Sequence, residues 1–329
     1  MASVKEIKAR IEGVRETRKI TNAMYLVAST KLRHAREALD KTRPYFDATR
    51  REVSRIFRAG EVADSRYFFD EKGEIPKGGV CGILLITADK GLAGSYNMNA
   101  IRRAEAILKE KSDSRLFVVG EFGRRHFRMR KIPTEENFRY TAQDPTLDRA
   151  RKICTLLLDL YDRKELNEII AVYTDMKSAL SSTAQVTRLL PLEHSAISTL
   201  SFPDARIHAH ENNNADANAY DHPGGETEDH ENKDKKPDFT FLPSADAVLA
   251  AVMRSYISGF FYSALVDSFC CEQNARVTAM DSAGRNADEL LSALSLQLNR
   301  ERQSAITQEI TEISAGAKAQ KNRKEAALS

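Results

Sequence analysis

Residues 4–42 read VKEIKARIEGVRETRKITNAMYLVASTKLRHAREALDKT, and this stretch decides the fold of the chain. An apolar or small residue recurs at every third or fourth position, which is typical of a coiled-coil seam. The second half of the seam uses small and polar residues that keep a helix slim, and Arg18 is its only charge. The seam positions are Val4, Ile7, Ile11, Val14, Arg18, Thr21, Tyr25, Ala28, Leu32, Ala35, Leu39 and Thr42.

The pattern predicts one N-terminal helix over residues 1–60. Pro44 lies inside it and should bend the helix or mark a local break, because proline removes a backbone hydrogen bond. Gly60 is the expected stop. A helix of roughly 55 residues would be about 80 Å long, and a globular core does not need that length.

A second long helix is predicted for residues 244–329, with Ser244 as its N-cap. The stretch contains no proline. Two helices that flank one domain can bury their seams only against each other, so the prediction is a long antiparallel coiled coil. The second seam is expected at Met280, Ala283, Ala287, Leu290, Leu294, Leu298, Ala305, Ile306, Ile310 and Ile313.

The part between the helices predicts an α/β domain over residues 75–203, completed by a last strand within 239–243. Apolar runs rich in β-branched residues predict strands, and amphipathic stretches predict helices between them. This alternation indicates a small, mostly parallel, Rossmann-like sheet. The expected strands are 80–87, 116–120, 169–174, 186–192 and 239–242, and the expected helices are 98–111, 122–129 and 146–163.

Residues 204–238 form an acidic segment, with ten Asp or Glu against four Lys or Arg. The segment has too few aliphatic side chains to offset the entropy of ordering it, so a disordered loop is expected. His208 and His210 lie near carboxylates and could hold a metal. A polar tract of this kind more often binds nothing specific, and no metal site is assigned.

The distribution of charged and apolar residues argues against nucleic-acid binding and against a membrane span. The net charge is +3, but residues 1–60 carry fifteen Lys or Arg against seven Asp or Glu. A solvated coiled-coil face explains this excess better than nucleic-acid binding, because no aromatic residue interleaves with the bases of residues 1–24. In the most apolar stretch, Ala245–Cys271, charges at Arg254 and Asp267 leave twelve uncharged residues between them. A membrane span needs about 20, so a buried helix is expected.

Four cysteines at positions 81, 154, 270 and 271 show neither metal-ligand nor disulfide spacing, and are expected as small buried residues.

Catalytic motifs are missing from the sequence. It contains no phosphate-binding loop with a Lys-Ser/Thr pair and no dinucleotide-binding glycine pattern after a strand. Gly91-Leu92-Ala93-Gly94 follows an expected strand and opens a helix, which could indicate an anion site. A tight structural turn built on Gly91 and Gly94 is the favoured interpretation. No catalytic residue, cofactor site or metal site is predicted.

Three segments carry a resemblance to a known family: Met1–Ala35, the turn TADKGLAGSYN at Thr87–Asn97, and Asn299–Ala317. All three resemble the gamma subunit of F-type ATP synthases, in the right order and on the expected elements. Ala88 and Ala93 stand where the family usually has Ser and Cys. Further matches are Glu272, Ala275, Arg276, Ala279, Met280, Asn286 and Ala287.

The resemblance implies a non-catalytic rotor that couples ion-driven rotation to ATP synthesis or hydrolysis. It implies a coiled coil inside a sleeve of alternating alpha and beta subunits. The α/β domain would rest, with the epsilon subunit, on the membrane ring of c subunits. The start MASVKEIK has no transit peptide, which favours the cytoplasmic side of a bacterial inner membrane, with peripheral attachment. Two features depart from the family. Position 242 is Leu where the family often has an acidic residue, and the tail Lys318–Ser329 is longer and more basic than the short apolar tip of the family.

The resemblance also implies contacts between the shaft and the catalytic sleeve. Met24 lies in the segment where family members touch the catalytic subunits, near Arg302 and Gln303 of the C-terminal helix. Seam packing is the alternative for Met24, and ordinary surface polarity is the alternative for the others. The candidate contacts are Met24, Arg276, Arg302, Gln303, Thr307 and Glu309.

Two other functions remain as alternatives. A coiled-coil adaptor with an α/β docking domain would show the seams without the Asn299–Ala317 motif. A nucleotide-using enzyme with helical extensions would need the phosphate-binding motif that the sequence lacks.

Overall fold

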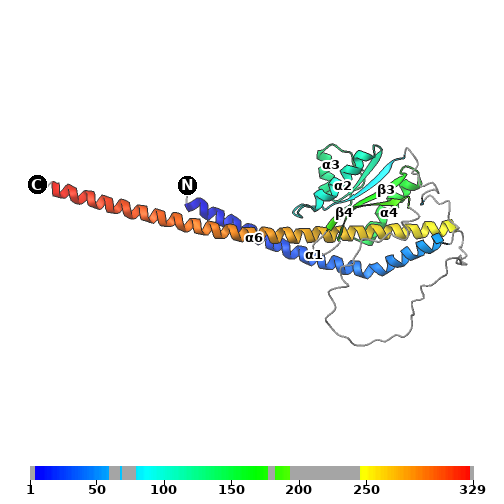
Figure 1. The fold of residues 1–329 in the computed structure, drawn as a ribbon, viewed down its shortest axis with the longest axis horizontal. Helices are drawn as coiled ribbons and strands as arrows, with labels where there is room; N and C mark the ends of the chain where they lie inside the picture. Colours follow the sequence, from blue (N-terminus) through cyan, green and yellow to red (C-terminus); the bar gives the residue numbers. More distant parts are fainter. Residues whose placement is uncertain (1–3, 59–66, 69–78, 177–181, 193–244, 327–329) are drawn as a thin grey trace, which may run out of the picture. The chain divides into compact units, whose positions relative to one another are not determined.

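The computed structural model describes residues 4–58, 67–68, 79–176, 182–192 and 245–326 (Figure 1). The chain divides into two compact units. Unit 1 comprises residues 1–28 and 276–329, and unit 2 comprises residues 29–275.

Two long helices contribute to both units. Helix α1 spans Val4–Arg58 (55 residues), and helix α6 spans Ala245–Ala326 (82 residues). Pro44 lies inside α1 without ending it, so the local break that proline can cause is absent. The expected helix stop at Gly60 and the expected cap at Ser244 lie outside the described residues.

In unit 1 the two helices pack as an antiparallel pair. Ile7 and Ile11 of α1 form a buried cluster with Leu294 of α6, and Val14, Leu291 and Leu298 pack against it. One turn further along α1, the Arg18 Nε lies 2.5 Å from the Asp288 Oδ1. Because contacts move backward along α6 as they move forward along α1, the helices run in opposite directions, as the seams predicted.

The α6 seam ends earlier than the sequence suggested. Packing stops near Leu298, and the expected seam residues Ala305, Ile306, Ile310 and Ile313 are exposed. Among the described residues, α1 begins at Val4, and none of them buries this end of α6. Figure 1 shows the red end of α6 extending beyond the N-terminus of α1. Leu290 is also exposed, and Leu291 packs in its place.

Unit 2 is built on a four-stranded sheet of order β2-β1-β3-β4. Its strands are β1 Cys81–Ile86, β2 Ser114–Val119, β3 Glu168–Met176 and β4 Ser182–Leu190. Strand β1 pairs in parallel with β2 and β3, and β4 pairs antiparallel with β3. This confirms the predicted mostly parallel α/β sheet. The acidic segment 204–238 and the expected strand 239–242 lie outside the described residues.

Helices cover both faces of the sheet. Helices α2 Tyr96–Glu110 and α3 Glu121–Met129 pack on one face, against alternate residues such as Ile83 and Leu85. Helix α4 Leu147–Asp162 packs on the other face with the first part of α6, against Leu84 and Ile86. Burial on both faces explains why β1 is apolar at every position except its glycine.

One described helix passes a length-and-hydropathy test for a membrane span. It lies within Ala247–Lys318, where an 18-residue stretch reaches a mean hydropathy of 1.3, and 67% of that stretch is buried inside the protein. Phe260, Phe261 and Leu265 of this helix belong to the core of unit 2, so its hydropathy is accounted for by packing on the sheet.

Candidate functional site

The end of α6 is a helix with its side chains in solvent. Every residue from 302 to 318 is exposed. Ile306, Ile310 and Ile313 are 47%, 58% and 72% exposed, and their spacing of four and three places them on one side of the helix. An exposed apolar stripe of this kind is a candidate contact surface for another molecule. We call these three residues the isoleucine stripe.

Four of the candidate contacts lie along this exposed end. Arg302, Gln303, Thr307 and Glu309 all belong to the solvent-exposed stretch. The Thr307 hydroxyl donates to the Gln303 carbonyl at 2.9 Å, so it is used locally in the helix. Arg302 and Glu309 are exposed on the same stretch as the isoleucine stripe, so the end of α6 carries both charged and apolar groups.

Met24 lies elsewhere on the shaft. It is 37% exposed, and its neighbours Ile20, Leu26 and Val27 are each 57% exposed. The adjacent turn of α1 lines an open hollow of about 480 Å³ together with residues 280–288 of α6. Met24 is therefore at the level of Met280, about 20 residues or roughly 30 Å from Arg302 along α6. The expected proximity of Met24 to Arg302 and Gln303 was wrong.

That hollow lies where the coiled coil is lined by small and charged side chains. Gly284 leaves open space where a Cβ would stand, and Thr21 opposite is buried. The Arg18–Asp288 ion pair connects the helices beside it. Arg276, the remaining candidate contact, is half-buried on α6 a few residues before the hollow.

The turn at Thr87–Asn97 is held by its own side chains. The Ala88 N–H donates to the Asn97 Oδ1 at 2.8 Å, and the Asn97 Nδ2 donates to the Lys90 carbonyl at 3.3 Å. Asp89 reaches further: its carboxylate accepts from the Glu121 N–H at 3.0 Å, from the Ala142 N–H at 3.0 Å and from the Gln143 N–H at 3.2 Å. The Thr141 hydroxyl donates to the same carboxylate. The turn therefore ties β1 to the start of α3 and to the loop before α4.

The backbone conformation and the hydrogen bonds of this turn show how it is built. Gly94 has a positive φ of 53°, and Leu92 has a φ of 62°, so the backbone twice enters the left-handed region. The turn contributes its own acceptors to the start of α2, because the Tyr96 N–H donates to the Ala93 carbonyl at 3.2 Å. Asp89 places a carboxylate beside the first backbone N–H of α3. Both observations favour the structural interpretation of Gly91 and Gly94 over an anion site.

All four cysteines are buried free thiols, as expected from their surroundings. Burial raises the pKa of Cys81, Cys154 and Cys270 to about 12, and raises that of Cys271 well above its ordinary value. At neutral pH these groups are therefore neutral thiols and poor nucleophiles. His208 and His210, the candidate metal ligands, lie outside the described residues.

Two functional features escaped the sequence analysis. Arg18 stood out as the only seam charge, but its partner Asp288 could not be paired with it without the register of the two helices. Asp89 is the anchor of the turn, yet its partners lie 32 to 54 residues away in the chain. The signal for Asp89 was only its place directly after a buried strand.

Comparison with known proteins identifies relatives along nearly the whole chain. A family model described as ATP synthase matches residues 3–320. The ATP synthase gamma chain of Acetivibrio thermocellus is 37% identical over 98% of this chain and 100% of its own length. The sodium-ion-specific ATP synthase gamma chain of Acetobacterium woodii is 34% identical over 96% of this chain and 98% of its own length.

A solved structure shares the fold. The rotor of the Euglena gracilis mitochondrial ATP synthase matches with a TM-score of 0.58 and 17% identity, covering 92% of this chain and 98% of its own. The sequence relatives, the family model and the two long helices flanking an α/β sheet agree, and this chain therefore belongs to the ATP synthase gamma chain family.

Proposed function

We propose that this chain is the central stalk of a proton- or sodium-driven F-type ATP synthase, coupling rotation of a membrane ring to ATP synthesis or hydrolysis. The observation that carries the proposal is the exposed end of α6 with its isoleucine stripe, on a helix pair too long and too thin to form a core of its own. Kinship with gamma chains over nearly the full length supports it.

The geometry suits a shaft inside a sleeve. Thr21 and Ala28 of α1 and Ala287 of α6 are buried small residues, which let two helices approach closely and keep the pair slim. The part of α6 in unit 1, residues 276–326, is about 75 Å long, and beyond Leu298 it continues alone. A shaft with two helices at one level and one at another is asymmetric, so each of its angles can stabilise a different sleeve conformation.

We assign the sleeve contacts to two levels of the shaft. Arg302, Gln303, Thr307 and Glu309 would meet the alpha and beta subunits around the exposed end of α6. Met24 and Arg276 would meet them at the hollow, roughly 30 Å away along α6. Contacts at two levels would also keep the shaft from tilting, because the tilting moment that two contacts oppose grows with the distance between them along the axis.

The remaining assignments follow from the same function. Residues 1–60 and 244–329 would form the stalk, and residues 75–203 with a last strand at 239–243 would form the foot, with 204–238 as a loop on it. The foot would bind the epsilon subunit and the ring of c subunits, which attaches the chain peripherally to the cytoplasmic face of a bacterial inner membrane. The chain itself would catalyse nothing and need no cofactor, with Gly91 and Gly94 serving a structural turn.

Reconstitution tests the proposal. The cognate alpha and beta subunits are assembled with and without this chain, and steady-state ATP hydrolysis and the subunit stoichiometry are measured. We expect a stable complex with one copy of this chain and multi-site turnover that depends on it. A chain that neither joins the complex nor changes turnover would favour the coiled-coil adaptor instead.

A further inference from the structure

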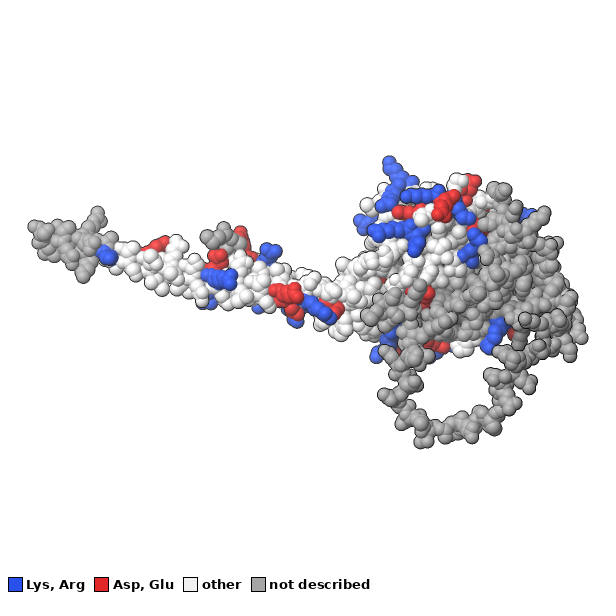
Figure 2. Space-filling model, viewed as in Figure 1, with Lys and Arg blue, Asp and Glu red and all other residues white. Residues whose placement is uncertain are grey.

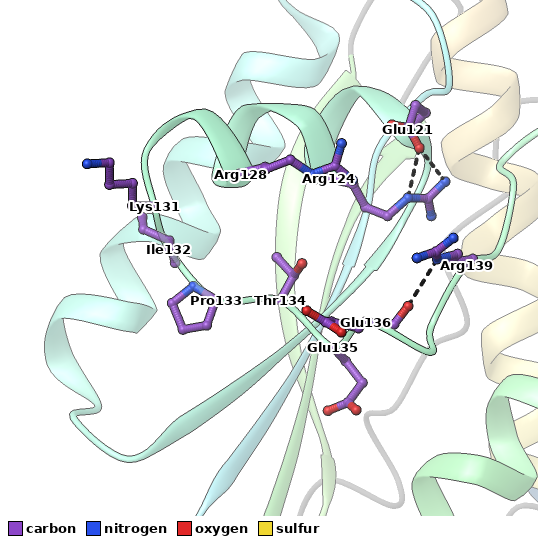
Figure 3. Close-up of a pocket in the computed structure, with 10 residues that line it drawn as sticks. All are labelled: Glu121, Arg124, Arg128, Lys131, Ile132, Pro133, Thr134, Glu135, Glu136 and Arg139. Carbon is purple, nitrogen blue, oxygen red and sulfur yellow. Dashed lines mark hydrogen bonds and ion pairs between the residues drawn. The ribbon is translucent and has the colours of Figure 1, made fainter.

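A second surface, on the foot, carries unneutralised positive charge. An open hollow of about 640 Å³ lies between α3 and the segment that follows it. Figure 3 shows Arg124 and Arg128 on the α3 side of this hollow, Arg139 reaching in from the loop, and Glu135 and Glu136 on the opposite side. The other lining residues are Glu121, Lys131, Ile132, Pro133 and Thr134. We call this the α3 hollow.

Some of these charges are already neutralised within the fold. The Arg124 Nη2 lies 3.0 Å from the Glu121 carboxylate, and its Nη1 donates to the carbonyls of Val118 and Tyr140 at 3.2 and 2.9 Å. Glu135 accepts from the Arg115 Nη2 at 2.7 Å. Arg124, Glu121 and Glu135 are thus structural, and their charges are not available to a ligand.

The charges that remain are mainly cationic. Among the described residues, no carboxylate lies within ion-pair distance of Arg128, Lys131 or Arg139. Only the Arg139 Nε is engaged, by the Glu136 backbone carbonyl at 3.2 Å. Within the part of the chain that the structure describes, Glu136 is the one acid of the hollow whose carboxylate has no ion-pair partner, so the unpaired lining charges are three cations and one anion. Figure 3 shows Lys131 at the edge of the hollow, with its side chain directed outward. Figure 2 shows Lys and Arg side chains gathered on this side of the foot.

The cations are not explained by helix stability alone. Arg128 in the last turn of α3, and Lys131 just beyond it, are favourable near the negative end of the helix dipole. That explanation fails for Arg139, which comes from another segment and extends its guanidinium toward the same space. Arg128 and Arg139 therefore bring two cations from different segments to one hollow, and an anionic partner would neutralise them.

We propose that the α3 hollow is a docking site for an acidic segment of a partner protein. Guanidinium groups such as those of Arg128 and Arg139 bind carboxylates through two parallel hydrogen bonds. Ile132 and Pro133 add an apolar wall for an aliphatic side chain.

A polypeptide fits the hollow better than a phosphate chain does. Phosphates offer only acceptors, and the unpaired Glu136 carboxylate would repel them. A peptide brings carboxylates for the arginines and backbone N–H groups that can donate to Glu136. Nucleic acid is disfavoured further because no aromatic side chain lines the hollow on which a base could stack.

The first test uses the full chain and an octapeptide of alternating glutamate and glycine, labelled with a fluorophore, with a serine-glycine octapeptide as the uncharged comparison. Fluorescence anisotropy should detect binding of the acidic peptide only. The double variant Arg128→Gln, Arg139→Gln should weaken that binding about tenfold, the effect of two exposed ion pairs near the upper end of their range. Circular dichroism establishes that the variant is folded.

The matched control is Arg125→Gln, which removes an exposed arginine of the same helix that does not line the hollow. It should change the affinity less than twofold. Equal weakening by the control and the double variant would show general attraction to positive charge and would overturn the proposal. Hydrogen exchange localises the contact: the peptide should slow exchange of backbone amides within residues 121–139, and protection elsewhere alone would also overturn it.

Two further arms separate the sources of acidic ligand. Deleting residues 212–234 removes most of the chain's own acidic segment and should leave peptide affinity unchanged. A severalfold gain in peptide affinity on deletion would mean that this segment of the chain itself occupies the hollow, and would contradict the assignment to a partner protein. Binding to vesicles of anionic lipid without binding to the peptide would likewise contradict the assignment. None of these measurements requires the other subunits, so the outcome is independent of the proposed rotor function.

Discussion

Gly120 offers the sharpest test of how the turn at Thr87–Asn97 is held. It precedes α3 with φ 94° and ψ 137°, a conformation that residues with a side chain rarely adopt. A Cβ added there would lie 2.2 Å from the Thr87 carbonyl oxygen and 2.7 Å from that of Ala88. Both atoms belong to the backbone of the turn, so neither can rotate away.

The expected cost of Gly120→Ala follows from these two effects. Backbone strain of this kind costs about 1–3 kcal/mol, and forcing a methyl group into packed backbone costs about 1–3 kcal/mol more. We therefore expect the free energy of unfolding to fall by about 3–5 kcal/mol. Gly94→Ala, within the turn itself, is the matched control, because its φ is also positive, at 53°, but open space surrounds its Cβ position. It should cost only about 1–2 kcal/mol.

Urea unfolding of the full chain, followed by circular dichroism, measures both variants. The two substitutions add the same methyl group at positions of positive φ, so the difference between them measures mainly the contact of Gly120 with the Thr87 and Ala88 backbone. If Gly120→Ala costs no more than Gly94→Ala, the backbone of the turn is not fixed as described, and the structural interpretation of this segment fails.

Three further predictions concern the shaft and the thiols. Met24→Lys should leave the stability of the isolated chain within about 0.5 kcal/mol of wild type, because the side chain is partly exposed. It should lower the amount of ATP synthesised per ion transported in reconstituted vesicles. Unchanged coupling would remove Met24 from the sleeve contacts. Replacing the three residues of the isoleucine stripe by glutamine should also leave the stability of the isolated chain unchanged. It should weaken binding of the chain to the alpha–beta hexamer by up to about 3–5 kcal/mol, since the three side chains together expose nearly the area of two whole isoleucines. An affinity within twofold of wild type would mean that the sleeve does not cover the stripe. The four cysteines should resist a thiol reagent at pH 8 in the folded chain and should all react in urea. Folding raises the pKa of Cys81, Cys154 and Cys270 from 9.0 to about 12, so between these values the folded state retains protons that the unfolded state loses. The contribution of these thiols to the free energy of unfolding is therefore full below pH 9 and falls from pH 9 to 12, and a flat pH dependence in that range would contradict their burial.

The sequence predicted the long helices well because helical periodicity is a local signal. Ile7 and Ile11 recur at the spacing of a seam, and they are buried as a seam should be. The same signal was misleading at Ile306, Ile310 and Ile313, since an apolar stripe looks alike whether its own chain or another protein covers it. Only the contacts between α1 and α6, which end near Leu298 among the described residues, show that α1 does not bury the stripe.

The candidate site was harder to predict from the sequence, because its contacts join residues that are distant in the chain. Gly91 and Gly94 identified a turn, but the four bonds to Asp89 depend on how the ends of the strands meet. The α3 hollow was missed altogether. Its signal was the basic run from Arg124 to Lys131, whose free and paired members can be separated only when the positions of Glu121 and Glu135 are known.

Direct observation of rotation tests the central claim most closely. Arg125→Cys provides an exposed thiol on the foot, and the buried native cysteines should not compete with it for a label. A bead or gold particle is attached there while the alpha–beta hexamer is fixed to a surface, and its motion is followed by microscopy after ATP is added. We predict stepwise rotation in one direction that stops when ATP is exhausted. Sustained ATP hydrolysis by the same complexes with a stationary particle would contradict it.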